Sequence, residues 1–133
     1  MNQPASEDLL ERVDQSLILA SRVNETAVFD RAGTRLGHID DLSIEKVGGR
    51  VVYAIMSFGG FLGIGARFHP VPWSLLTYDV ERAGFVVPLD PSILKDAPSY
   101  NLEELRQLGG PDYRAHGDAI FSYYGPYGAA PYW

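Results

Sequence analysis

Cysteine is absent from this sequence of 133 residues. Its absence excludes a disulfide framework, a thiolate zinc site and a cysteine nucleophile. The length fits a single domain, which hides roughly two-thirds of its unfolded surface and needs no covalent or metal cross-link. We therefore expect a fold that is stabilised by an ordinary hydrophobic core.

Basic residues are scarce. The chain has 11 Lys and Arg against 17 Asp and Glu, which gives a formal net charge of −6. A surface of this sign repels phosphate backbones, so we expect no direct binding to nucleic acid. A protein partner is easier to accommodate.

Long apolar segments are also missing. No segment approaches the ~20 apolar residues that a membrane helix needs. The N-terminal residues lack the basic segment and the long apolar run of a signal peptide. We expect a cytoplasmic protein without membrane insertion.

Short apolar segments separated by turn residues occupy residues 17–89. Gly48-Gly49 predicts a tight hairpin between two of them. About six short strands at such close spacing are typical of a small barrel or sandwich. The predicted strands cover residues 17–21, 26–29, 36–45, 50–58, 75–79 and 85–89.

The segment 50–58 is apolar on both faces of the strand it predicts. Val51, Tyr53 and Ile55 share one face, and the alternate residues 52–58 are apolar as well. Only one face of a barrel wall can point inward. The other face must be covered by a helix, by the tail or by another subunit, because it would otherwise expose an apolar patch.

Helices are predicted at both ends of the chain. Residues 1–16 form an N-terminal arm or a short helix, with apolar residues at helical spacing. Asn101 can cap a helix over residues 102–108, which Gly109-Gly110-Pro111 would end. The tail 113–133 carries five of the eight tyrosines, and this aromatic content favours docking on protein over a mobile tail.

Two parts of the sequence have a recognisable pattern. Residues 36–44, LGHIDDLSI, match G-x-[IV]-x-D-[LIV], and so resemble the opening strand pair of the PRC-barrel family. The glycine run 58–65 followed by Val71-Pro72-Trp73 resembles the glycine loop and closing strand of its stand-alone bacterial members. The resemblance covers roughly residues 17–98.

The resemblance implies a mainly β fold, a small, strongly bent antiparallel β-barrel of about six strands with short flanking helices. The predicted division is an arm at 1–16, the barrel at 17–98, and a short helix with an aromatic tail at 99–133. The family includes the cytoplasmic domain of the photosynthetic reaction-centre H subunit and the C-terminal domain of a ribosome-maturation factor. Both have binding or assembly roles.

No pattern in the chain predicts chemistry. The glycine run lacks a following Gly-Lys-Ser/Thr, so it is not a P-loop. His38 and Asp40 would point the same way from a strand, but two ligands are too few for a metal site. We therefore predict no catalytic residue, no cofactor and no metal.

The predicted function is a non-catalytic interaction or assembly module that self-associates through the central strand and the tail. A dimer is the first expectation for the oligomer. One alternative is a small-ligand barrel that uses the glycine loop 59–65. Another is an assembly factor for a ribosomal or membrane complex, with an unknown protein partner. The candidate interaction residues are Gly59, Gly60, Phe61, Leu62, Gly63, Ile64, Gly65, Tyr53, Met56, Tyr123, Tyr124, Tyr127 and Trp133.

Overall fold

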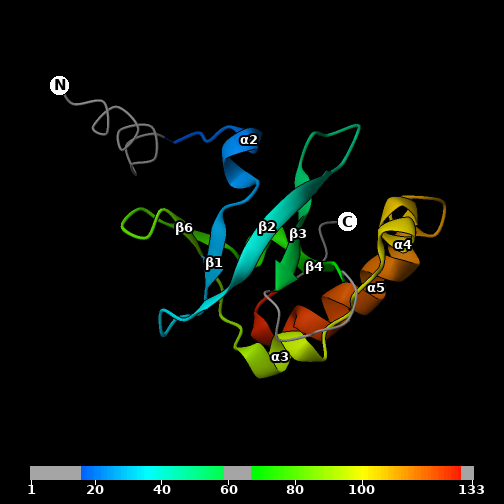
Figure 1. Cartoon of the computed structure of the whole chain (residues 1–133). Helices are drawn as coiled ribbons and strands as arrows, with labels where there is room; N and C mark the ends of the chain where they lie inside the picture. The colour runs from blue at the N-terminus through cyan, green and yellow to red at the C-terminus, as the bar shows by residue number, and fades with distance from the viewer. Residues whose placement is uncertain (1–15, 59–66, 130–133) are drawn as a thin grey trace.

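The computed structural model describes residues 16–58 and 67–129. Within these residues, six strands form one sheet in the order β4-β3-β2-β1-β6-β5 (Figure 1). The mainly β class with about six strands and short flanking helices is confirmed. The strands are β1 (Ala27–Phe29), β2 (Arg35–Ile44), β3 (Val51–Phe58), β4 (His69–Pro72), β5 (Thr77–Asp79) and β6 (Gly84–Val86).

One strand pair departs from the expected antiparallel pattern. Strands β1 and β6 pair in parallel, while the other four pairings are antiparallel. After β4, the 3-10 turn η2 (Trp73–Leu75) leads the chain away from β3 to the other end of the sheet. The β5–β6 hairpin therefore joins the sheet beside β1. Register shifts in the β1–β2 and β2–β3 pairs bend the sheet.

Strand β4 is an edge strand, a position that tolerates its two prolines. Pro70 and Pro72 both lie in β4 and offer no N–H to a neighbour. The strand pairs with β3 and stands at one end of the sheet order. Proline at this edge prevents further strand addition.

The strand predicted at residues 17–21 is wrong. Residues Ala20–Val23 form a single helical turn, α2, and residues 16–19 before it have no regular structure. Leu17 and Leu19 are 88% and 71% exposed, so no neighbouring strand covers them. A short apolar run fits either a strand or a helix. None of the described strands pairs with this segment, so nothing favours the strand.

Helices follow the sheet in sequence. Helix α3 (Pro91–Lys95) begins at Asp90, whose carboxylate accepts a hydrogen bond from the Ile93 N–H. Helix α4 (Leu102–Gln107) confirms the predicted helix and has a complete capping box between Asn101 and Glu104.

Helix α5 (Tyr113–Tyr124) and the short η3 (Gly125–Tyr127) lie where only a tail was predicted. The buried residues of α5 are spaced at three, one and three positions, which makes one apolar stripe. They are Gly117, Ile120, Phe121 and Tyr124. The helix lies against the sheet at β4 (Figure 1), and its stripe belongs to the core. The predicted docking of the tail is thus confirmed for residues 113–129.

Strand β3 is covered on both faces by its own chain. Tyr53, Ala54, Ile55 and Met56 are all buried. The ring of Tyr53 contacts the ring of Phe121 in α5, with centroids 5.7 Å apart. The prediction that the second apolar face must be covered is confirmed, and α5 contributes to the cover.

No helix among the described residues is long and apolar enough to cross a membrane.

Candidate functional site

The hairpin that joins β2 and β3 projects from the sheet (Figure 1). Its base is closed by two hydrogen bonds, from the Glu45 N–H to the Arg50 carbonyl and from the Gly49 N–H to the Glu45 carbonyl, each 2.8 Å long. Gly49 has a φ of +76°, which a side chain would disfavour. The predicted hairpin is confirmed, although its loop spans residues 46–49 rather than the two glycines alone.

Apolar side chains remain in water on this hairpin. Val47 is 97% exposed and Ile44 is 51% exposed. Ile44 ends the alternating pattern of β2, while Val47 occupies the loop, where polar residues are usual. A pair of exposed aliphatic residues beside a hollow is typical of a contact surface.

The hollow lies between the hairpin and the chain that connects α4 to α5. Its volume is about 350 Å³. We call it the hairpin groove; it is lined on the hairpin side by Ile44, Val47, Val52 and Tyr53, and on the helical side by Leu108 and Tyr113. Tyr53 and Leu108 are nearly buried and form its base, and Tyr113 is exposed at the rim.

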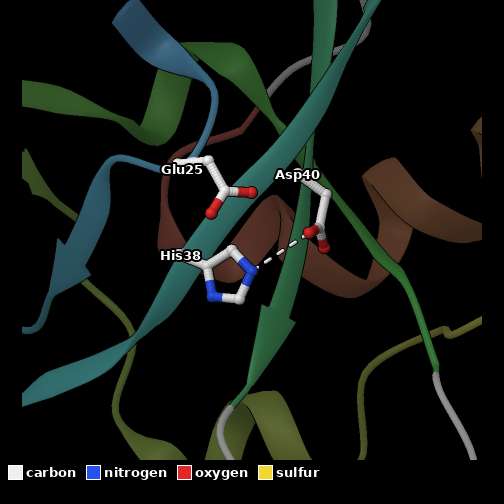
Figure 2. Close-up of side chains that lie close together, drawn as sticks. All are labelled: Glu25, His38 and Asp40. Atoms are coloured by element: carbon white, nitrogen blue, oxygen red, sulfur yellow. Dashed lines mark hydrogen bonds and ion pairs between the residues drawn. The ribbon is translucent and has the colours of Figure 1, made fainter.

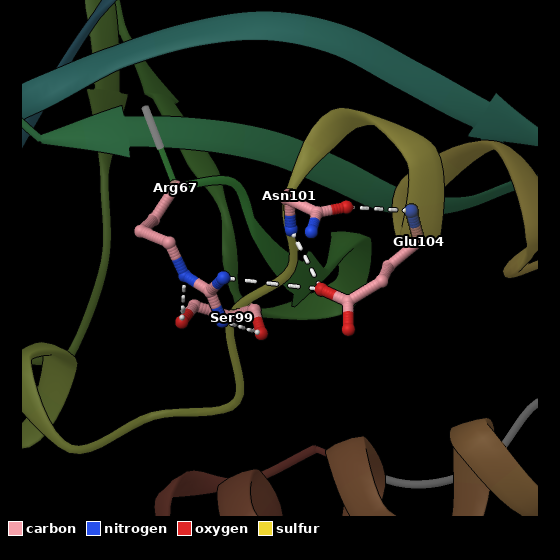
Figure 3. A network of polar contacts seen from close by, with 4 residues as sticks. All are labelled: Arg67, Ser99, Asn101 and Glu104. Atoms are coloured by element: carbon pink, nitrogen blue, oxygen red, sulfur yellow. Dashed lines mark hydrogen bonds and ion pairs between the residues drawn. The ribbon is translucent and has the colours of Figure 1, made fainter. Parts of the chain in front are cut away.

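A polar network holds the helical side of the groove in place (Figure 3). The guanidinium of Arg67 donates to the Ser99 hydroxyl at 3.1 Å and to the Ser99 carbonyl at 2.8 Å, and lies 3.8 Å from the Glu104 carboxylate. Backbone bonds of 2.8 and 2.9 Å join Phe68 and Tyr100 in both directions. The start of β4 is thereby tied to α4, which leads directly to Leu108.

A second group of polar side chains lies where the chain enters the sheet (Figure 2). Glu25 precedes β1, and His38 and Asp40 belong to β2. Each of the three offers one ligand atom, and these atoms all lie within 4.8 Å of one another. We call this group the polar cluster. His38 Nε2 is 3.0 Å from Asp40 Oδ1.

The local fold explains this convergence. His38 and Asp40 stand two residues apart on a strand, and Ser57 on β3 pairs with His38 and donates its hydroxyl hydrogen bond to Asp40. Glu25 arrives from the other side, with its N–H bonded to the Ile39 carbonyl and a φ of +71°. The sequence gives His38 and Asp40 but does not identify Glu25, because a backbone reversal brings it to the strand.

His69 is a buried polar residue without a hydrogen-bond partner. Its side chain is 2% exposed, neither ring nitrogen has a partner, and its ring centroid lies 4.5 Å from that of Phe58. Burial, aided by the positive charge of Arg67, lowers the pKa of His69 to about 4. The ring is therefore a neutral part of the core at neutral pH.

The five predicted interaction residues that the structure describes are buried or half-buried. Tyr53, Met56 and Tyr124 are buried in the core of the single chain, and Tyr123 and Tyr127 are half-buried against it. The hydroxyl of Tyr123 donates to the Ile93 carbonyl. Burial raises the pKa of Tyr124 well above its ordinary value, and its hydroxyl has no partner. Of these five residues, Tyr53 lines the hairpin groove.

The remaining predicted residues lie outside the described part of the chain. They are Gly59, Gly60, Phe61, Leu62, Gly63, Ile64, Gly65 and Trp133.

Taken together, the curved six-stranded sheet, its bulges and its short flanking helices define a small, mainly β domain. A comparison with protein-family profiles matches residues 16–94 to the PRC-barrel domain. The match covers more than half of the chain, and the protein belongs to the PRC-barrel family. Membership indicates a small domain involved in interactions or assembly. A search of curated proteins finds no match.

The family match ends inside α3. Helices α4 and α5 therefore lie beyond it, although α5 contacts β3 through Phe121, and Leu108 and Tyr113 line one side of the hairpin groove. Seven of the residues that line the groove belong to the family domain, and three belong to the segment that follows it.

Proposed function

We propose that the chain is a non-catalytic interaction module that associates with a second copy of itself through the hairpin groove. The observation that carries this proposal is the exposure of Val47 (97%) and Ile44 (51%) beside an apolar hollow. Each Å² of apolar surface that leaves water contributes about 25 cal/mol. The projecting hairpin therefore favours burial in a contact.

The hairpin groove is suited to a copy of its own hairpin. A two-fold interface uses the same patch on both subunits, so a projection and a matching hollow must lie on one face. Val47 supplies the projection, and the hollow beside it has an apolar base of Val52, Tyr53 and Leu108. Glu45 and Lys46, which carry opposite charges, also line the groove and can pair across a two-fold axis.

The hairpin groove differs from most of the surface that the sequence predicts for self-association. Met56 and Tyr124 are fully buried within one chain and offer nothing to a partner. The contact area of a hairpin and a groove is small, so we expect a weak dimer with a micromolar dissociation constant.

The other predicted roles remain predictions. A ligand site in the glycine loop would fall on residues 59–65, outside the described chain. Assembly of a ribosomal or membrane complex rests on the family likeness, and the cytoplasmic location rests on the sequence. The described surface favours the contact at the hairpin groove.

The absence of native cysteine allows a direct test. Val47→Cys and Gly109→Cys variants are mixed under mild oxidation, since Gly109 lines the groove and a Cβ there would meet nothing within 4 Å. The proposed dimer places residue 47 of one copy in the groove of the other. A mixed disulfide between the two variants should therefore form faster than in the control mixture of Val80→Cys with Gly109→Cys.

Sedimentation provides the second measurement. The unmodified chain should change from monomer towards dimer as its concentration rises through roughly 50 μM, the range of a weak contact. Val47→Lys should shift this change to higher concentration, and Val80→Lys, which adds the same charge elsewhere, should not. A chain that stays monomeric, or a Val47→Lys variant that dimerises normally, would show that the proposal is wrong.

A further inference from the structure

The polar cluster combines one imidazole and two carboxylates. Two carboxylates held this close repel each other, and a positive ion between them would relieve that repulsion. We propose that the polar cluster binds a divalent transition-metal ion of the zinc or manganese type.

The spacing of the ligand atoms fits a shared ion. Nitrogen and oxygen ligands that sit about 2.0–2.2 Å from one metal ion are separated by roughly 3 Å from their neighbours. His38 Nε2 and Asp40 Oδ1 already have this spacing, at 3.0 Å. The ligand atom of Glu25 lies within 4.8 Å of both, and its exposed side chain points towards them (Figure 2).

The second layer of contacts orients the site. The hydroxyl of Ser57 donates to the other oxygen of Asp40, which leaves Oδ1 directed at His38. Partners of this kind fix the orientation of a metal-binding carboxylate. The strand pairing sets the position of Ser57, because β3 places it opposite His38.

The backbone at Glu25 also fits a binding role. Its φ of +71° lies in the left-handed region, where glycine is favoured and a residue with a Cβ is strained. Strained positions of this kind concentrate where a side chain has a task. Here the strain places a carboxylate over β2, next to two other ligands.

The donor set decides the class of ion. A mixture of nitrogen and carboxylate oxygen suits Zn²⁺ and Mn²⁺, whereas Ca²⁺ and Mg²⁺ prefer oxygen alone. Three protein ligands leave the remaining positions to water. The bound ion would tie the segment before β1 to β2 and stabilise the entry of the chain into the sheet. This inference is independent of the hairpin groove.

The test uses the full-length chain without an affinity tag. Titration calorimetry with ZnCl₂ should give one ion per chain, and Zn²⁺ should raise the melting temperature. Asp40→Asn should weaken binding at least tenfold while keeping an acceptor for Ser57. Asp41→Asn is the matched control, because its carboxylate bonds the neighbouring Leu42 N–H, and it should bind like the unmodified chain.

The Glu25→Gly variant distinguishes an effect on metal binding from an effect on the stability of the fold. Glycine suits the left-handed backbone, so this variant should melt without metal at the same temperature as the unmodified chain or higher. It should nevertheless lose most of the stabilisation by Zn²⁺. With Co²⁺ as the probe, the visible absorption of the bound ion should disappear in His38→Gln.

Several results would overturn the proposal. One is the absence of Zn²⁺ binding to the unmodified chain at roughly 100 μM, far above the range of a specific site. Another is equal binding by Asp40→Asn and Asp41→Asn. If Zn²⁺ stabilised the Glu25→Gly variant as much as the unmodified chain, the ion would bind elsewhere. If Mg²⁺ stabilised the unmodified chain as much as Zn²⁺ does, the effect would be one of charge in general.

Discussion

Gly37 shows how closely two strands approach at one residue. A Cβ at this position would stand 2.1 Å from the backbone oxygen of Ser57 and 3.0 Å from Phe58 Cα. Both atoms belong to the backbone of β3, so neither can move aside cheaply. The need for glycine here arises from the approach of the neighbouring strand.

We expect Gly37→Ala to lower the free energy of unfolding by about 2 kcal/mol or more, the cost of overpacking a well-packed interior. Gly109→Ala is the matched control, since nothing lies within 4 Å of a Cβ there. Urea denaturation of both variants measures the difference. Equal midpoints would mean that β2 and β3 have room to separate.

His69 makes stability depend on pH. The pKa of a histidine is 6.5 in the unfolded chain and about 4 in the buried site, where burial and the Arg67 charge lower it. Between these values the unfolded chain binds more protons than the folded one. The stabilising effect of the neutral ring is therefore complete above pH 6.5 and is lost as the pH falls towards 4.

His69→Leu removes this proton uptake and leaves an apolar side chain of similar size beside Phe58. We expect the variant to gain stability relative to the unmodified chain as the pH falls from 7 to 4. Guanidinium denaturation at several pH values measures the difference. If the two proteins differed in their free energy of unfolding by the same amount at pH 7 and at pH 4, the buried histidine would not be the cause of the pH dependence.

Helix α5 is the element on which the cover of β3 depends. Phe121 is 5% exposed and its ring contacts that of Tyr53 on β3. Phe121→Ala should lower the free energy of unfolding by about 3–5 kcal/mol, as expected for truncating a buried Phe. Ser122→Ala, at an exposed position of the same helix, should change it by less than about 0.5 kcal/mol.

Thermal or urea unfolding compares these two variants. A Phe121→Ala protein as stable as Ser122→Ala would show that the helix is dispensable for the sheet.

Local signals predicted several elements well. The glycine pair predicted the β2–β3 hairpin, and Asn101 predicted the start of α4. Each depends on residues that are neighbours in the chain, so the sequence records them directly.

Elements that depend on distant contacts were missed. Helix α5 contains Gly117 and several tyrosines, which are weak helix formers, and packing against the sheet selects the helix. The sequence placed His38 and Asp40 on one face of a strand and predicted no metal site there, since the third residue, Glu25, reaches β2 only through a backbone reversal before β1. The hairpin groove was missed for the same reason, since its two sides are more than fifty residues apart in the chain.

At the scale of the whole molecule, one hydrophobic core crosses the predicted boundary at residue 98. Buried residues of the family domain pack with buried residues of the segment after it. The second group comprises Leu108, Ile120, Phe121 and Tyr124. The two parts of the chain therefore depend on each other for burial, although the family match covers the first alone.

We expect a chain that ends at residue 98 to lose its cooperative folding. Without α5 the Tyr53 ring loses its contact with Phe121, and the newly exposed apolar surface should bind a hydrophobic dye and promote aggregation. Adding a peptide of residues 99–133 should restore cooperative unfolding, because the covering surface need not be covalently joined. The same peptide carrying Phe121→Ala should restore it less effectively. A shortened chain that unfolds with the midpoint of the full chain would instead show that the sheet holds its own core, and that the helices were added to build the groove.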